Sequence, residues 1–406
     1  MKKINLEPPL RFSEFHQEYR TGSFLKFGSF YYGKSAPKWS LSEDAKTPCV
    51  RYGELYSTFS GEVDSIRSYT NIPKEKLKFS SGGEVLIPRV GENPLDFSKA
   101  SYLPLKDIAI GEMISVYETE ENGRYITQYI RGKLTKKFAR VVEGGNVSNL
   151  YFRYLEPIEI ALPSLNEQKK VADLFDKLDK KINLLKKKYD LLERYKKGAM
   201  QKIFKQDIRF KDENGSDFPN WTTERIDYFI ERYNNPVDVD PNESYRQIGI
   251  RSHGKGVFHK ESIQGHELGD KRVFWVHPDA FVVNIVFAWE HAVAKTSKDE
   301  KGFIASHRFP MFLPKDSRVD LRFFTLFFLS KRGKYLLELA SPGGAGRNKT
   351  LGQSNFAELK VTFPCLEEQK RIADFNDSLE EKLETVKKQI ELTKTFKKGL
   401  LQQMFV

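Results

Sequence analysis

Two stretches of the chain carry the same pattern of hydrophobic and polar positions. In each, apolar side chains recur at alternating steps of four and three residues, which predicts one face of a long helix. The first seam is Val171, Phe175, Leu178, Ile182, Leu185, Tyr189, Leu192, Ala199 and Ile203, with Lys196 as its polar member. The second is Ile372, Leu379, Leu383, Val386, Ile390, Leu400 and Met404, interrupted by Asn376, Thr393 and Lys397. A pattern sustained over about four heptads is typical of a coiled coil.

The two stretches are copies in a tandem repeat. Residues 162–204 align without a gap with residues 363–405, at a constant offset of 201 residues. Glu167 and Gln168 align with Glu368 and Gln369, for example. Because the chain has 406 residues, this offset divides it into two half-molecules.

The segments before the helices contain short β-like runs separated by turns, such as residues 84–88 and 280–289. We therefore predict an α+β fold with two mixed α/β domains, residues 1–160 and 207–361, and two long helices, residues 161–206 and 362–406. At ~1.5 Å per residue, residues 166–204 would extend roughly 58 Å, too far for burial in one small domain. The pattern also fits helices that dimerise with another chain. Two copies, each after a globular block, favour pairing within the chain.

Composition limits the choice of partners. The chain is 30% charged with a mean hydropathy of −0.55, and no run approaches the ~18 apolar residues of a membrane span. Cys49 and Cys365 lie far apart without metal-type neighbours, so we expect a reducing cytoplasm. The N-terminus lacks an apolar signal core, which agrees with this expectation.

A net charge of +12 suggests a polyanionic partner. The first helix segment carries +7 and the second is neutral.

Three stretches of the second domain are candidates for DNA contact, because arginine and asparagine suit base edges while lysine suits phosphates. Their candidate residues are Arg251, His253 and Lys255 in residues 250–256, Arg308 in residues 305–310, and Arg347, Asn348 and Lys349 in residues 343–350. The last stretch resembles a phosphate-binding loop, but Asn348 replaces the required glycine, which excludes a nucleotide site. Ordinary surface turns are the alternative for each stretch.

The first domain offers Lys34, Arg51, Tyr52 and Arg89 among aromatic residues and turns. A different class of function is also open. Asp279, Asp299 and Lys301 fit the loose carboxylate–carboxylate–lysine pattern of Mg²⁺-dependent nucleases. The histidines between His253 and His307 match no zinc template, so no metal site is expected.

The repeated signature resembles that of a known family. Residues 162–173 and 363–374 share Leu/Phe-Pro-x-Leu-x-Glu-Gln-Lys-x-hydrophobic-Ala-Asp, and Lys-Lys-Gly closes both helices at 196–198 and 397–399. With the tandem repeat, this is similar to the DNA-specificity subunit of type I restriction–modification systems over the whole chain. Residues 250–256, 284–290 and 306–310 resemble one common class of target-recognition domain.

The resemblance implies a non-catalytic protein that binds double-stranded DNA. Its two helices would pair antiparallel and dock two methyltransferase (modification) subunits, and a restriction/translocase subunit would join them. S-adenosylmethionine, ATP and Mg²⁺ would be bound by those partners and not by this chain. Each domain would read one half of a bipartite, asymmetric target. The half-site centres would lie about one to one and a half DNA turns apart, at roughly 34–36 Å per turn.

The residues expected in the coiled coil and in subunit docking are Glu167, Gln168, Leu178, Leu185, Leu192, Glu368, Gln369, Leu379, Leu383 and Val386. The basic first helix would face the copy that carries Glu380, Glu381 and Glu384, and Asn376 and Thr393 would fix the register.

Overall fold

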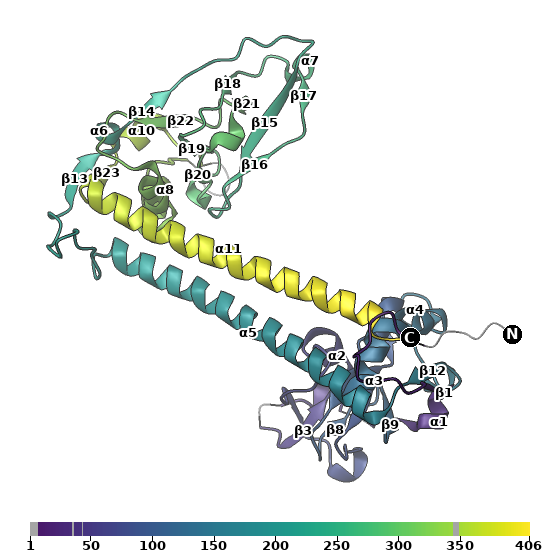
Figure 1. Cartoon of the computed structure of the whole chain (residues 1–406). Helices are drawn as coiled ribbons and strands as arrows, with labels where there is room; N and C mark the ends of the chain where they lie inside the picture. Colours follow the sequence, from purple (N-terminus) through teal and green to yellow (C-terminus); the bar gives the residue numbers. More distant parts are fainter. Residues whose placement is uncertain (1–6, 35, 43, 344–348) are drawn as a thin grey trace. The chain divides into compact units, whose positions relative to one another are not determined.

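The computed structural model describes residues 7–34, 36–42, 44–343 and 349–406. The chain forms two compact units, one of residues 1–188 and 386–406 and the other of residues 189–385. The two long helices are α5 (Leu165–Phe204) and α11 (Leu366–Gln403), drawn in teal and yellow in Figure 1. Each unit therefore holds one mixed domain and part of both long helices.

Unit 1 contains four small sheets, with strand orders β1-β12, β10-β11-β6, β2-β9-β5-β7 and β4-β3-β8. Its strands are β1 (Arg20–Ser23), β2 (Gly28–Tyr32), β3 (Thr47–Val50), β4 (Ser68–Thr70), β5 (Glu84–Pro88), β6 (Val90–Gly91), β7 (Ser101–Leu103), β8 (Ala109–Ile110), β9 (Ile114–Thr119), β10 (Glu143–Gly144), β11 (Ser148–Asn149) and β12 (Glu159–Leu162). Its shorter helices are α1 (Phe24–Phe27), α2 (Tyr52–Ser57), α3 (Gly123–Tyr129) and α4 (Thr135–Arg140), with a π-helical turn η4 (Ile130–Leu134) and 3₁₀ turns η1 (Lys38–Ser40), η2 (Lys74–Lys76), η3 (Pro94–Ser98) and η5 (Phe152–Tyr154).

Unit 2 contains three sheets, with strand orders β13-β23, β14-β22-β19-β20 and β16-β15-β21-β18, the last joined by β17. Its strands are β13 (Thr222–Arg225), β14 (Ile230–Tyr233), β15 (Ser244–Ile250), β16 (Val257–His259), β17 (Ile263–Gln264), β18 (Val273–Trp275), β19 (Phe281–Val283), β20 (Val293–Lys295), β21 (Phe303–Ser306), β22 (Met311–Pro314) and β23 (Lys360–Phe363). Its shorter helices are α6 (Ile226–Phe229), α7 (Gly265–Leu268), α8 (Leu321–Leu329), α9 (Lys331–Leu339) and α10 (Gln353–Glu358), with 3₁₀ turns η6 (Ala288–Glu290) and η7 (Lys298–Glu300).

Both domains share one frame although their sequences differ. Strand β1 pairs antiparallel with β12, which leads into α5, and β13 pairs in the same way with β23, which leads into α11. A short helix and a strand follow in each unit, α1 and β2 in the first and α6 and β14 in the second. The tandem repeat therefore extends from the helices into the domains.

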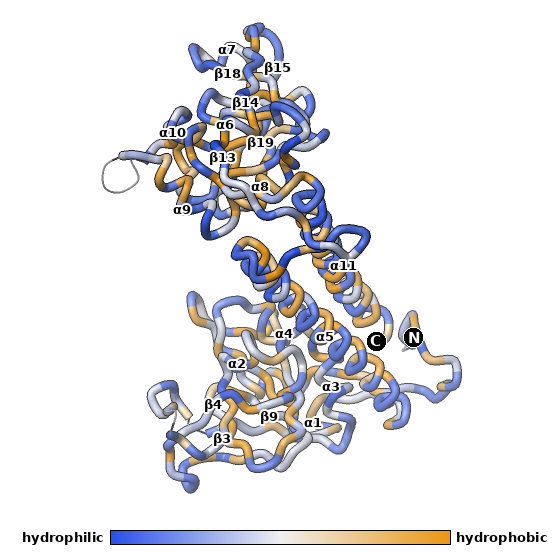
Figure 2. The backbone as a smooth tube through the Cα atoms, turned by 90° about the vertical axis from the view of Figure 1, so that its left-hand side faces the viewer, coloured by the Kyte–Doolittle hydropathy of each residue, from blue (hydrophilic) through white to orange (hydrophobic). Residues whose placement is uncertain are grey.

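The long helices run antiparallel to each other within each unit. In unit 1 the rings of Phe175 and Phe405 lie 5.7 Å apart, and further along α5 Asp179 meets the earlier residue Lys397 of α11. In unit 2 Lys196 meets Glu380. Further along α5, Ile203 joins the same core as Ile372 and Ala373, which come earlier in α11. Figure 2 shows hydrophobic residues recurring along both helices between hydrophilic ones. These features confirm the predicted fold class and the pairing within the chain.

The seam predicted from the heptads faces inward. Val171, Phe175, Ile182 and Ile203 of α5 are buried, while Leu178, Leu185 and Leu192 are partly buried. Leu379, Leu383 and Val386 of α11 are also buried. Burial of this apolar stripe, at about 25 cal/mol per Å², is what stabilises helices of 40 and 38 residues.

Two ion pairs across the seam occupy the same positions in the repeat. The ammonium of Lys397 lies 2.7 Å from both carboxylate oxygens of Asp179, and Lys196 pairs with Glu380. Thr393 instead donates to the main-chain oxygen of Gln389 in its own helix. The Thr393 hydroxyl is therefore satisfied within its own helix, and the role of Asn376 and Thr393 in fixing the register stays a prediction. Within the described residues the Asn376 side-chain oxygen is buried without a hydrogen-bond partner.

The end of each long helix completes the core of the domain in its unit. Phe405 packs against Tyr125 and Tyr129 of α3, with ring centroids 5.1 and 5.7 Å apart. Phe204 packs in unit 2 against Phe323 and Phe327 of α8, at 6.0 and 5.9 Å. Each domain core thus includes the end of the helix that belongs to the other copy of the repeat.

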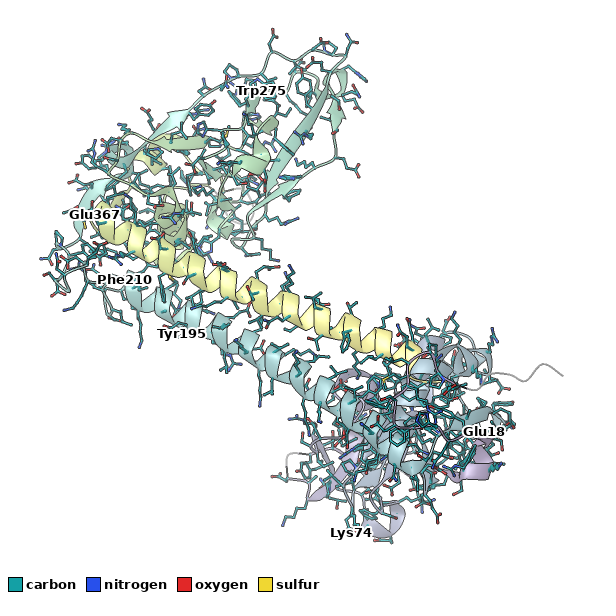
Figure 3. All side chains as sticks on the ribbon, in the orientation of Figure 1. Glu18, Lys74, Tyr195, Phe210, Trp275 and Glu367 are labelled. Carbon is teal, nitrogen blue, oxygen red and sulfur yellow. The ribbon has the colours of Figure 1, made fainter. Side chains whose placement is uncertain are left out.

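Aromatic contacts continue past the end of α5. The rings of Tyr195 and Phe210 lie 6.4 and 5.6 Å from that of Phe375 on α11. Figure 3 labels Tyr195 near the end of α5 and Phe210 just beyond it. The polar segment that follows α5 is therefore anchored to the helix pair in unit 2.

Candidate nucleic-acid interface

The repeated Glu-Gln motif joins each long helix to its own domain. Arg11 donates two hydrogen bonds of 2.9 Å to the buried carboxylate of Glu167, and these bonds raise the pKa of the guanidinium. Arg209 does the same to Glu368, at 3.1 and 2.6 Å. The pKa of Arg209 is raised for the same reason.

The glutamine of each motif bonds to a helix N-terminus. Gln168 accepts from the main-chain N–H of Asn122, the residue that caps α3, and Gln369 accepts from that of Asp320, which caps α8, each at 3.0 Å. All four motif side chains are at most 1% exposed. These bonds give all four side chains a role within the chain, and their part in subunit docking stays a prediction. Arg11, which neutralises Glu167, lies too far away in sequence for the motif itself to indicate this.

The first predicted DNA-binding stretch of unit 2 is the loop between β15 and β16. His253, Gly254 and Gly256 adopt positive φ angles of 61°, 67° and 76°, which shape a tight connection between the paired strands. The loop is held by main-chain bonds from His253 to Glu290 (2.7 Å) and from Gly254 to His291 (3.0 Å). Arg251 lies over the ring of Phe258 at 4.9 Å, and Arg251, His253 and Lys255 are exposed.

The segment Asn284–His291 brings the other stretches to this loop. Ile285 donates its N–H to the main-chain oxygen of Arg308 (3.0 Å) and accepts from Leu351 (2.8 Å). The ammonium of Lys349 lies 5.7 Å from the ring centre of Trp289. Thus the structure brings together Arg251, His253, Lys255, Arg308 and Lys349, which come from three separate stretches. Arg347 and Asn348 lie outside the described residues.

The same segment supplies aromatic residues that sequence reasoning did not select as contacts. Phe287 is 37% exposed, and Trp289 is oriented by a hydrogen bond from its indole N–H to the oxygen of Val286 at 3.1 Å. The signal was available, because residues 284–290 already resembled a target-recognition segment. The combination of exposed cations and aromatic rings suits a nucleic acid.

The candidates of unit 1 gather around the segment Ile110–Ile114. Lys34 donates its N–H to Ile110 (2.8 Å), Val50 accepts from Gly111 (2.9 Å) directly before Arg51, and Arg89 donates to Met113 (3.0 Å). The structure therefore brings the main chains of Lys34, Arg51 and Arg89 to one end of the β2-β9-β5-β7 sheet. Tyr52 packs partly against the core around Val50 and Leu55, which gives it a packing role.

Arg89 is the best-positioned cation of this group. Its guanidinium lies over the rings of Tyr32 and Tyr151, at 4.6 and 6.0 Å, so its plane is held in place. Its Nε is buried and has no hydrogen-bond partner within the described residues. One terminal N–H group also donates to the sulfur of Met113 at 3.4 Å, and the remaining terminal N–H groups of a guanidinium held in this way suit a base edge or a phosphate.

Unit 1 also exposes a residue that sequence reasoning missed. Trp39 is 79% exposed in the turn η1. The neighbouring residue Ser40 is hydrogen-bonded to Thr70 at 2.8 Å, beside Tyr69, which is 42% exposed. A single tryptophan in a turn carries no periodic signal, so only its exposure reveals it.

The nuclease pattern does not form a metal site. Asp279 pairs with Lys295, while Asp299 and Lys301 belong to the turn η7 and the residue after it. In the described ranges, no group of three or more His, Cys, Asp or Glu side chains is placed to hold a metal ion. Nor does any helix within those ranges have the length and apolar character needed to cross a membrane.

These features define a class. The chain consists of two repeats, each with a mixed domain that presents basic and aromatic loops and a long helix. A family model of the type I restriction modification DNA specificity domain matches residues 27–194 and 281–394. The chain therefore belongs to this family, as its signature predicted. The family model describes DNA specificity, and the comparisons give no support to the nuclease alternative.

Known relatives agree with this assignment. The type I restriction enzyme MjaVIII specificity subunit of Methanocaldococcus jannaschii is 21% identical over 295 residues, which span 66% of this chain and 66% of that protein, just under two thirds. The crystal structure of a type I restriction-modification S subunit from M. genitalium matches 98% of this chain and 99% of its own, with a TM-score of 0.57 and 11% identity. The HsdS subunit of Thermoanaerobacter tengcongensis matches 96% and 97%, with a TM-score of 0.51 and 13% identity. At these identities the two structures show a shared fold.

Proposed function

We propose that this chain reads a bipartite, asymmetric DNA target, one half with each domain. The observation that carries the proposal is the pair of basic, aromatic loop clusters, one on each copy of the same frame. In unit 2 the cluster consists of Arg251, Lys255, Arg308 and Lys349, whose stretches all contact the segment Asn284–His291. In unit 1 it is built from Lys34, Arg51 and Arg89.

The two clusters differ in the sequence of their loops and in the strands that carry them, so the two half-sites should differ as well. The frame is shared, from β1 and β13 to the Glu-Gln motifs. Residues on loops carry recognition in such a case, while the frame sets their position. Arginines of these clusters suit guanine edges, and the lysines suit phosphates.

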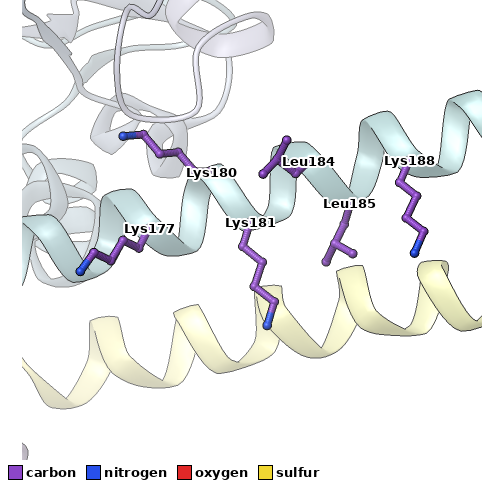
Figure 4. A pocket seen from close by; sticks show the side chains of 6 residues that line it. All are labelled: Lys177, Lys180, Lys181, Leu184, Leu185 and Lys188. Atoms are coloured by element: carbon purple, nitrogen blue, oxygen red, sulfur yellow. The ribbon is translucent and has the colours of Figure 1, made fainter.

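Assembly with modification subunits would use an exposed surface of the helices. One such surface lies on α5 in unit 1, beside the seam residue Leu185, where Lys177, Lys180, Lys181, Leu184, Leu185 and Lys188 line a groove of about 360 Å³. Figure 4 shows Lys180 and Leu184 on one side of the helix and Lys181, Leu185 and Lys188 on the other. Leu184 is 67% exposed. An exposed leucine framed by lysines suits a partner with an apolar contact and acidic surroundings.

The chemistry would then lie with the partners. We propose two methyltransferase subunits that carry S-adenosylmethionine, and a restriction/translocase subunit that uses ATP and Mg²⁺. The assembled complex would act on DNA in the cytoplasm. This division of labour agrees with the family, whose model describes DNA specificity.

Methylation-sensitive sequencing tests the proposal. Cells that lack other adenine methyltransferases would express the chain together with its modification subunit. We expect methylation at one bipartite motif with two different halves. A continuous motif, a symmetric motif, or no change in methylation when the chain is added would contradict the proposal. Cells with the modification subunit alone are the control.

A further inference from the structure

A second basic site in unit 1 is lined by residues other than those of the loop cluster. A pocket of about 320 Å³ lies between the π-helical turn η4 and the two long helices. Its charged walls are Lys99, Arg131, Asp179, Lys186, Lys394, Lys397 and Lys398. Six cationic side chains thus face a single carboxylate.

Half of this positive charge is already neutralised by neighbours. Lys397 is paired with Asp179, Lys99 with Asp96 at 3.1 Å, and Lys394 with Glu391 at 2.7 Å. In the part of the chain that the structure describes, Arg131, Lys186 and Lys398 contact no carboxylate. These three define the free charge of the pocket.

Arg131 is the fixed part of the pocket. One of its terminal N–H groups donates to the main-chain oxygen of Ala100 at 2.9 Å, which leaves other donors of the guanidinium free. Burial lowers the pKa of Arg131 and of Lys397, and repulsion from Arg131 lowers the pKa of Lys397 further, while Asp179 opposes the shift at both. A bound anion would relieve this cost.

The backbone keeps the walls close together. A Cβ atom on Gly132 in η4 would lie 3.1 Å from the main-chain oxygen of Leu401 in α11, so the turn and the helix approach closely here. π-helical turns are often found at functional sites.

The repeat shows that this charge is specific to one copy. On the helices, the pocket positions Asp179, Asn183, Lys186, Lys394, Lys397 and Lys398 correspond to Glu380, Glu384, Lys387, Glu193, Lys196 and Lys197. The first set carries a net charge of +3 and the second set is neutral. A coiled coil needs no such difference, which points to a ligand.

We propose that this pocket binds a phosphate group, supplied by the backbone of the DNA to which the chain is bound. A guanidinium held among ammonium groups matches the charge and shape of a phosphate. The contact would anchor DNA without reading its sequence. The existence of a phosphate site does not depend on the proposed function. The statement that DNA supplies the phosphate does rest on the proposed function.

Two variants of the full chain separate these points. Lys186 and Lys398 are exposed, so K186A/K398A should fold normally. The matched control is K387A/K197A, which removes lysines at the corresponding positions of the repeat. Arg131→Lys, which keeps the charge but loses the fork of donors, tests the fixed part of the pocket.

The first measurement is the thermal stabilisation by inorganic phosphate, compared with chloride at equal ionic strength. We expect the affinity for phosphate to fall by about tenfold or more in K186A/K398A and to stay unchanged in the control. Equal stabilisation of wild type and K186A/K398A would overturn the site.

The second measurement is the salt dependence of binding to duplex DNA of random sequence. Loss of one DNA phosphate contact should reduce the slope of log K against log salt by about 0.9. A phosphate effect with an unchanged slope would show that a free phosphate compound, and not DNA, occupies the site, and would overturn the DNA assignment. Absence of DNA binding by the wild type would refute the proposed function and leave the phosphate result standing.

Discussion

At the scale of single residues, Phe405 ties the first domain to α11. This residue directly follows that helix and packs against α3, which lies more than two hundred residues earlier in the chain. Its side chain is fully buried against Tyr125, Tyr129 and Phe175. Removal of a buried phenylalanine loses the transfer free energy of the ring and leaves a cavity.

Phe405→Ala should therefore lower the free energy of unfolding of unit 1 by about 3–5 kcal/mol. Phe396→Ala is the matched control, because Phe396 lies in the last turns of α11, shortly before Phe405, and is 58% exposed. Hydrogen exchange of the amides in α3 and β9 measures the effect within unit 1 alone. Equal protection in both variants would contradict a core role for Phe405.

Arg89 tests recognition at the same scale. Lysine keeps the charge but loses the planar fork that Tyr32 and Tyr151 hold in place. If Arg89 reads a base, Arg89→Lys should weaken binding of the specific target by about 1–3 kcal/mol and change binding to random DNA little. Arg67→Lys, at an exposed position of unit 1, is the control. Competition binding measures the affinity of each variant for the specific target and for random DNA. Equal losses on both DNAs would assign Arg89 to a phosphate.

At the scale of elements, the two equivalent ion pairs of the coiled coil differ in burial. The side chains of Asp179 and Lys397 are 22% and 12% exposed, whereas those of Glu380 and Lys196 are 56% and 24% exposed. Solvent screens the exposed pair, so its removal costs less. Loss of Asp179 would leave Lys397 close to Arg131 without a counter-charge.

Asp179→Asn should thus destabilise the chain by roughly 2 kcal/mol, as expected for a partly buried pair, and Glu380→Gln by less than about 1 kcal/mol. Urea unfolding followed by circular dichroism of the helices compares the two isosteric variants directly. A larger effect from Glu380→Gln would show that burial does not set the strength of these pairs.

The elements also show how far sequence reasoning reaches. The heptad seam was predictable because its period is local, and the structure buries or partly buries the expected residues from Val171 to Met404. The Glu-Gln motif was visible, but its role depends on Arg11 and Arg209, which are 156 and 159 residues away. The DNA-binding candidates could be chosen by residue type, yet their gathering around residues 110–114 and 284–291 follows from long-range strand pairing that no local pattern encodes.

At the scale of the whole molecule, the repeat makes each domain an exchangeable reader on a common frame. The frame consists of the β1-β12 and β13-β23 pairs, the Glu-Gln motifs and the helix ends. Residues 207–361 lie between the two long helices, so a foreign domain with the same frame contacts can replace them. The first half of the target should not respond to such a change.

The most direct measurement is the methylated motif of a chain in which residues 207–361 are replaced by the corresponding domain of another family member. Methylation-sensitive sequencing of cells that express it with the modification subunit would read the motif. The account predicts that one half of the bipartite target changes and the other half is retained. A change in both halves, or in neither, would contradict the claim that the two domains read DNA separately.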